Sequence, residues 1–137
     1  MGLQASIDLT YSKEIDIKSF IESLFNVGWD TNDNGKITYL LNDDYDWESA
    51  NLNDQEAIKK MLLDRFSINK TVGIALTLPN LTGALFHFLP TKNEVMILLN
   101  INRVKFKETQ FTDYTFYINK LYPIIKDCSK LNYCDVI

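Results

Sequence analysis

The sequence has few of the residues from which catalytic and metal sites are usually built. Its 137 residues include one histidine and two cysteines, too few to form a cluster with zinc-ligand spacing. No apolar run approaches the roughly 18 residues of a membrane span, and no basic and apolar leader marks a secretory signal. Without such a leader, Cys128 and Cys134 are expected to be free thiols. We therefore predict a cytoplasmic, non-enzymatic protein with no catalytic residues, cofactor, metal or membrane.

The apolar residues that are present gather in short runs between residues 71 and 106. Three runs stand out: Val72–Leu78, Gly83–Leu89 and Val95–Ile101. Turns rich in Pro, Asn and Thr separate them, which predicts three strands of one antiparallel meander. In the first run Gly73, Ala75 and Thr77 share one face, and these small side chains predict close packing of a helix there.

The other segments carry strand and helix patterns in alternation. Apolar and polar residues alternate over Leu3–Thr10, which indicates a half-buried strand. Helical spacing indicates helices over Ile17–Phe25, Asp54–Phe66 and a stretch after Thr112, where Pro123 bends or restarts the helix. The predicted order is β-α-β-β-α-β-β-β-α. We expect residues 1–137 to form one α+β domain, with a single mostly antiparallel sheet and its helices chiefly on one face.

The segment that begins at Asp30 imitates half of a calcium-binding loop. Oxygen-bearing side chains recur at alternate positions and Gly35 is the sixth residue, as in an EF-hand. The twelfth position requires a bidentate glutamate, and Leu41 stands there instead. Asn34-Gly35 is also the preferred pair for a two-residue hairpin turn. We therefore predict a turn and no metal site.

The acidic residues are concentrated in one part of the chain. Eight acids and one lysine lie between Asp30 and Glu56, whereas the whole chain has a net charge of −4. A local negative field favours a basic protein partner over nucleic acid, although acidic loops also serve solubility. Large aromatic residues alternate with acids in one loop, which is the predicted partner-binding site: Asp43, Asp44, Tyr45, Asp46, Trp47 and Glu48.

Trp47 can have either of two roles. On an exposed loop, the indole is an anchor within an acidic rim. Folded back, it covers part of the core, and the neighbouring acids simply face water. The sequence does not choose between the two.

Two other groups of residues deserve a hypothesis. A small ligand-binding or enzymatic α+β domain is the alternative function, with a pocket near His87, Tyr114 and Tyr117. Arg103, Lys105 and Lys107 continue the apolar stripe of the third run. They either block edge pairing of a strand that runs past the core or form a small basic patch for nucleic acid, which the acidic composition disfavours.

A resemblance adds to this interpretation. The alternating strand Leu3–Thr10, the pair Gly28-Trp29 after the first helix, the loop Asp43–Glu48 and the late helix Phe116–Leu121 together resemble the small immunity proteins of bacterial polymorphic-toxin systems. The resemblance covers the whole chain in style. It implies a cytoplasmic bacterial protein that binds one cognate toxin and blocks it. The acidic segment predicts that the toxin's binding surface is basic. It leaves the oligomeric state open.

Overall fold

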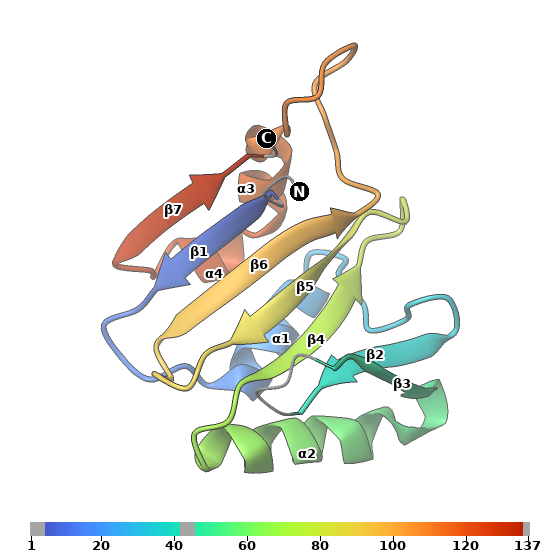
Figure 1. The fold of residues 1–137 in the computed structure, drawn as a ribbon, viewed down its shortest axis with the longest axis vertical. Coiled ribbons are helices and arrows are strands. Elements are labelled where there is room, and N and C mark those ends of the chain that lie inside the picture. Colours follow the sequence, from blue (N-terminus) through green and yellow to red (C-terminus); the bar gives the residue numbers. More distant parts are fainter. Residues whose placement is uncertain (1–4, 42–45, 136–137) are drawn as a thin grey trace.

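The computed structural model describes residues 5–41 and 46–135, and shows one sheet with helices packed against it (Figure 1). The elements are β1 (Ser6–Thr10), α1 (Ile17–Phe25), β2 (Lys36–Leu40), β3 (Glu48–Asn51), a short 3-10 helix (Leu52–Asp54), α2 (Gln55–Ser67), β4 (Val72–Thr77), β5 (Gly83–Phe88), β6 (Glu94–Ile101), α3 (Tyr114–Lys120), α4 (Tyr122–Ile125) and β7 (Lys130–Cys134). The predicted α+β class is confirmed, and β7 is added after the predicted order.

The seven strands form one antiparallel sheet in the order β3-β2-β4-β5-β6-β1-β7. The predicted meander β4-β5-β6 occupies its centre. The first strand, β1, lies between β6 and the last strand, β7. The two ends of the described chain are thus neighbours in the sheet, while the short strand β3 forms the opposite edge.

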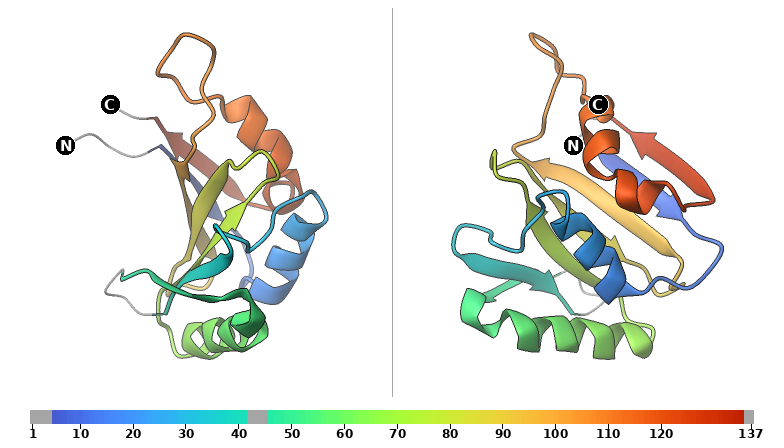
Figure 2. Two further views of the ribbon diagram at one scale, coloured as in Figure 1. Left: turned by 90° about the vertical axis from the view of Figure 1, so that its right-hand side faces the viewer. Right: turned by 180° about the vertical axis from the view of Figure 1, so that it is seen from behind.

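The helices cover one face of the sheet, where the large apolar side chains point. In the left panel of Figure 2, α1, α3 and α4 lie on the same side of the strands. Phe86 and Phe88 of β5 are fully buried on this face. Phe20 of α1 packs edge-on against both rings, and Phe66 of α2 packs edge-on against Phe88. These rings form the centre of the core.

Local signals in the sequence fix the ends of the helices. Asp16 caps α1 by accepting a hydrogen bond from the amide of Ser19 at 3.2 Å. Gly28, with φ of 107°, turns the chain after this helix. The last helix restarts after Leu121, and Pro123 lies in the first turn of α4, so the predicted interruption at Pro123 is confirmed.

The segment with the calcium-loop pattern forms the predicted turn. Asn34 and Gly35 have φ of 54° and 85°. Asp33 and Lys36 exchange backbone hydrogen bonds of 2.7 and 3.1 Å on either side of them. The side chain of Leu41 lies in the hydrophobic core, so it leaves the twelfth loop position without an oxygen ligand.

We predict that this segment has no micromolar affinity for calcium, because the closing carboxylate is absent and the backbone is already paired as a hairpin. Isothermal titration of the chain with calcium chloride measures this directly. A micromolar isotherm that disappears in Asp30→Ala would contradict the prediction.

Two expectations about the central strands are wrong. The face of β4 with the small residues Gly73, Ala75 and Thr77 does not receive a helix; the large residues on the other face do, because they supply more apolar area to bury. The basic residues after Ile101 do not extend β6. Asn102, with φ of 47°, ends the strand, and Arg103, Lys105 and Lys107 lie on a loop that projects beyond the sheet (Figure 1).

Within residues 5–41 and 46–135, no helix combines the length and the apolar character needed to cross a lipid bilayer.

Candidate binding surface

The face of the sheet opposite the helices is the candidate site. Residues paired across neighbouring antiparallel strands point to the same face, so the strand register defines its composition. One row crosses six strands: Leu40, Gly73, His87, Met96, Asp8 and Asn132. The next row contains Ala75, Leu85, Leu98, Ser6 and Cys134. We call this surface the helix-free face.

Trp47 packs onto the helix-free face and covers part of it. A Cβ atom built on Gly73 would lie 2.8 Å from Cη2 of the indole, so only a glycine leaves room for this ring. The indole also meets the imidazole of His87 edge-on, with ring centroids 5.2 Å apart. Trp47 is half-buried. Of its two predicted roles, the structure shows the one in which the indole folds back onto the sheet.

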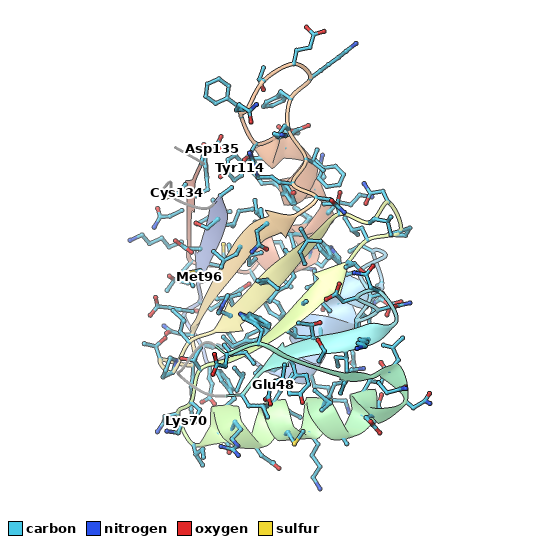
Figure 3. The ribbon with its side chains drawn as sticks, turned by 45° about the vertical axis from the view of Figure 1, so that its right-hand side comes forward. Glu48, Lys70, Met96, Tyr114, Cys134 and Asp135 are labelled. Atoms are coloured by element: carbon cyan, nitrogen blue, oxygen red, sulfur yellow. The ribbon has the colours of Figure 1, made fainter. Side chains whose placement is uncertain are left out.

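The centre of the helix-free face is apolar and only partly covered. Leu40 and Ala75 are fully buried, whereas Leu85, Met96 and Leu98 remain half-buried. Met96 lies on β6, near the middle of the sheet (Figure 3). An antiparallel sheet with one face toward water usually carries polar residues on that face. An apolar strip in this position is a feature of binding surfaces.

Acidic side chains surround the apolar strip. Asp8 shares its row, and Glu94 is paired with Thr10 on the same face. Asp46 is exposed next to Trp47. Glu48 is exposed on the edge strand β3 (Figure 3), but it pairs with Tyr39 and so points to the covered face. The predicted acidic site therefore extends onto strands that are distant in the sequence.

The position of Asp8 on this face is energetically unfavourable. Its Oδ1 atom is buried without a hydrogen-bond partner among the described residues. Burial, and secondarily the charge of Glu94, raise the pKa of the Asp8 carboxyl. A carboxylate in this situation is stabilised when a cation approaches it, which fits a basic binding partner.

The structure does not bring together the residues of the alternative pocket. His87 points to the helix-free face, whereas Tyr114 and Tyr117 belong to α3 on the covered side. Tyr117 is fully buried, and its hydroxyl accepts a hydrogen bond from the amide of Val104 at 2.9 Å. Asp8 lies two strands from His87, a separation of roughly 10 Å. Asp8 and His87 are therefore too far apart to form a catalytic histidine-carboxylate pair with each other.

The burial of His87 predicts that the protein loses stability in mild acid. Burial lowers its pKa from the ordinary value of 6.5. As the pH falls below 6.5, the unfolded chain therefore binds a proton before the folded chain does, and the free energy of unfolding decreases until the pH passes the folded pKa. Denaturant unfolding at about pH 7.5 and about pH 5.5 measures this change.

The control for this prediction is His87→Gln, because His87 is the only histidine in the chain. The raised pKa of Asp8 acts in the opposite direction, and this contribution is present in both proteins. The decrease between the two pH values should therefore be smaller in His87→Gln. An equal decrease would contradict the assignment to His87.

The predicted partner-binding loop reaches this surface with part of its residues. Asp46 and Trp47 lie at its β3 side, whereas Glu48 points to the covered face. Asp43, Asp44 and Tyr45 fall outside the described residues. Sequence reasoning missed Leu85, Met96 and Leu98, the apolar strip. Their alternation within β5 and β6 was visible, but both faces of these strands are apolar, so the pattern does not reveal which face the helices leave open.

Two further features of the described residues concern metal binding and surface grooves. Residues 5–41 and 46–135 contain no group of three or more His, Cys, Asp or Glu side chains that could hold a metal. A groove of about 370 Å³ between α1 and α2 is lined by apolar residues and by charges of both signs, among them Glu22, Lys59 and Lys60.

In comparison with known proteins, no family model, no curated protein and no solved structure matches this chain.

Proposed function

We propose that this protein is a non-enzymatic binding protein of the immunity type, which binds and neutralises a cognate bacterial toxin in the cytoplasm. The helix-free face is the surface that meets the toxin. The partly covered apolar strip of Leu85, Met96 and Leu98 carries this proposal, because it offers water-exposed apolar area that a partner can bury.

The charges around the strip indicate the chemistry of the partner. Asp8, Asp46 and Glu94 give this side of the molecule a negative rim. Such a rim attracts a basic surface over a distance and excludes acidic ones, so it contributes mainly to the rate of association and to specificity. A toxin that acts on nucleic acid carries the required basic surface.

Trp47 supplies an organised contact within the rim. Its indole is fixed against Gly73 and His87 before any partner arrives. A ring that is already ordered loses little conformational entropy on binding. Tryptophan is also among the residues most often found at the energetic centre of interfaces.

The charged rim and the indole should affect different rate constants. Asp46→Asn with Glu94→Gln should slow association with the toxin and weaken its dependence on salt. Trp47→Ala should accelerate dissociation, by an amount equivalent to about 2 kcal/mol. Surface plasmon resonance with the product of the gene immediately upstream provides both rates, after circular dichroism has verified that each variant is folded.

Glu22→Gln is the matched control for the charge changes, since Glu22 is exposed on α1, on the covered side. It should leave both rates unchanged. Unchanged rates in the rim and Trp47 variants would remove this surface from the interface, and no binding by the unmodified chain would contradict the proposed partner.

A further inference from the structure

A second exposed surface projects from the sheet. The chain between β6 and α3 forms a narrow loop that extends beyond the end of β6 (Figures 1 and 2). We call residues 102–113 the projecting loop. It begins directly after β6, which contributes Leu98 to the helix-free face, so the loop adjoins the candidate binding surface.

The tip of the projecting loop presents two phenylalanines to solvent. Phe106 and Phe111 are 50% and 67% exposed. The amide of Phe106 donates a hydrogen bond to the carbonyl of Phe111 at 3.0 Å, so the two residues stand opposite each other. Lys105 and Lys107, on either side of Phe106, are also exposed. Glu108 is exposed beside them, so the tip combines apolar rings with a small net positive charge.

The base of the loop is held in one conformation. The guanidinium of Arg103 donates to the carbonyl of Gln110 at 3.0 Å and to Oγ1 of Thr112 at 2.7 Å. It also lies 3.7 Å from the carboxylate of Asp135, which accepts hydrogen bonds from Thr112. Polar contacts at the base of the loop thus hold a segment whose tip presents two phenylalanines to water.

We propose that the projecting loop is a second contact with the same protein partner, and that Phe106 and Phe111 enter an apolar pocket with an acidic rim on that partner. This inference rests on the proposed function. The two contacts have opposite charge: the helix-free face is acidic and the loop tip is basic. A partner with the complementary pattern is oriented as well as attracted, because the reversed orientation brings like charges together.

The hydrogen bonds at the base of the projecting loop favour a protein over a lipid surface as its binding partner. A preorganised loop matches a pocket of defined shape and loses little entropy there, whereas a fluid bilayer requires no such order. Membrane attachment through one small loop alone is also marginal.

The test compares four variants in surface plasmon resonance with the product of the gene immediately upstream. Phe106→Ser with Phe111→Ser should accelerate dissociation roughly thirtyfold, and Lys105→Glu with Lys107→Glu should slow association roughly tenfold. Ile68→Ser and Lys60→Glu are matched controls. Ile68 is 59% exposed at the end of α2 and Lys60 is exposed on α2, both far from the loop. Neither control should change the rates.

Three outcomes would overturn the inference, each in a different way. If the unmodified chain binds and the loop variants bind equally well, the loop is not a contact, and the proposed function stands. If the unmodified chain does not bind, the proposed function fails and this inference fails with it. If the unmodified chain instead pellets with vesicles of phosphatidylcholine and phosphatidylserine, and the phenylalanine variant does not, the loop binds lipid and the assignment to a protein pocket is wrong.

Discussion

Phe86→Ala is expected to lower the free energy of unfolding by about 3–5 kcal/mol. Phe86 is fully buried on β5 at the centre of the covered face. Its ring meets that of Trp29 at 5.6 Å and that of Phe20 at 6.3 Å, both edge-on. Truncation removes these contacts and leaves a cavity that a sheet strand with partners on both sides cannot collapse to fill.

Urea denaturation followed by circular dichroism measures this loss. Phe111→Ala is the matched control, because it removes the same atoms from an exposed position and should change the stability by less than about 0.5 kcal/mol. A loss below about 1 kcal/mol in Phe86→Ala would contradict the position of this ring in the core.

Trp29→Ala is expected to have an effect of similar size, about 3–5 kcal/mol. Among the described residues, Trp29 has the largest fully buried side chain. Its indole N–H donates a hydrogen bond to the carbonyl of Lys120 at 2.9 Å. The residue therefore joins the end of α3 to the core, and its loss leaves a buried carbonyl without its partner as well as a cavity.

The pair of variants provides a stricter test than either alone. Trp29 and Phe86 touch, so the double variant should cost less than the sum of the two single variants. Thermal and urea unfolding, both followed by far-ultraviolet circular dichroism, give the change in the free energy of unfolding for each single variant and for the double variant. Strict additivity would mean that the two rings do not share one packed cluster.

Much of the fold follows from short-range sequence patterns. The alternation up to Thr10, the helical spacing over Ile17–Phe25 and the Asn34-Gly35 turn each depend on neighbours in the chain, and each formed as predicted. Pro123 interrupts the last helix for a reason that is equally local. Local geometry of this kind is encoded within a few residues.

The rest depends on contacts between distant residues, which one sequence does not specify. β7 forms because residues 130–134 find the free edge of β1, a pairing across most of the chain. The open face of the sheet could not be assigned because β4 and β5 are apolar on both faces. Gly73 gives the clearest example. Its small size predicted that a helix packs against this face of β4, but the group that lies over Gly73 is the indole of Trp47.

The position of β1 between β6 and β7 constrains how the protein is made. Ser6–Thr10 leaves the ribosome before either of its partner strands, and the first of these is encoded roughly 90 residues later. Until then its apolar residues Ile7 and Leu9 have no sheet to join, and its second edge stays open until residues 130–134 are synthesised. During synthesis this strand is therefore the segment most exposed to incorrect pairing. A nascent chain that stops before β7 should aggregate more readily than one that includes it.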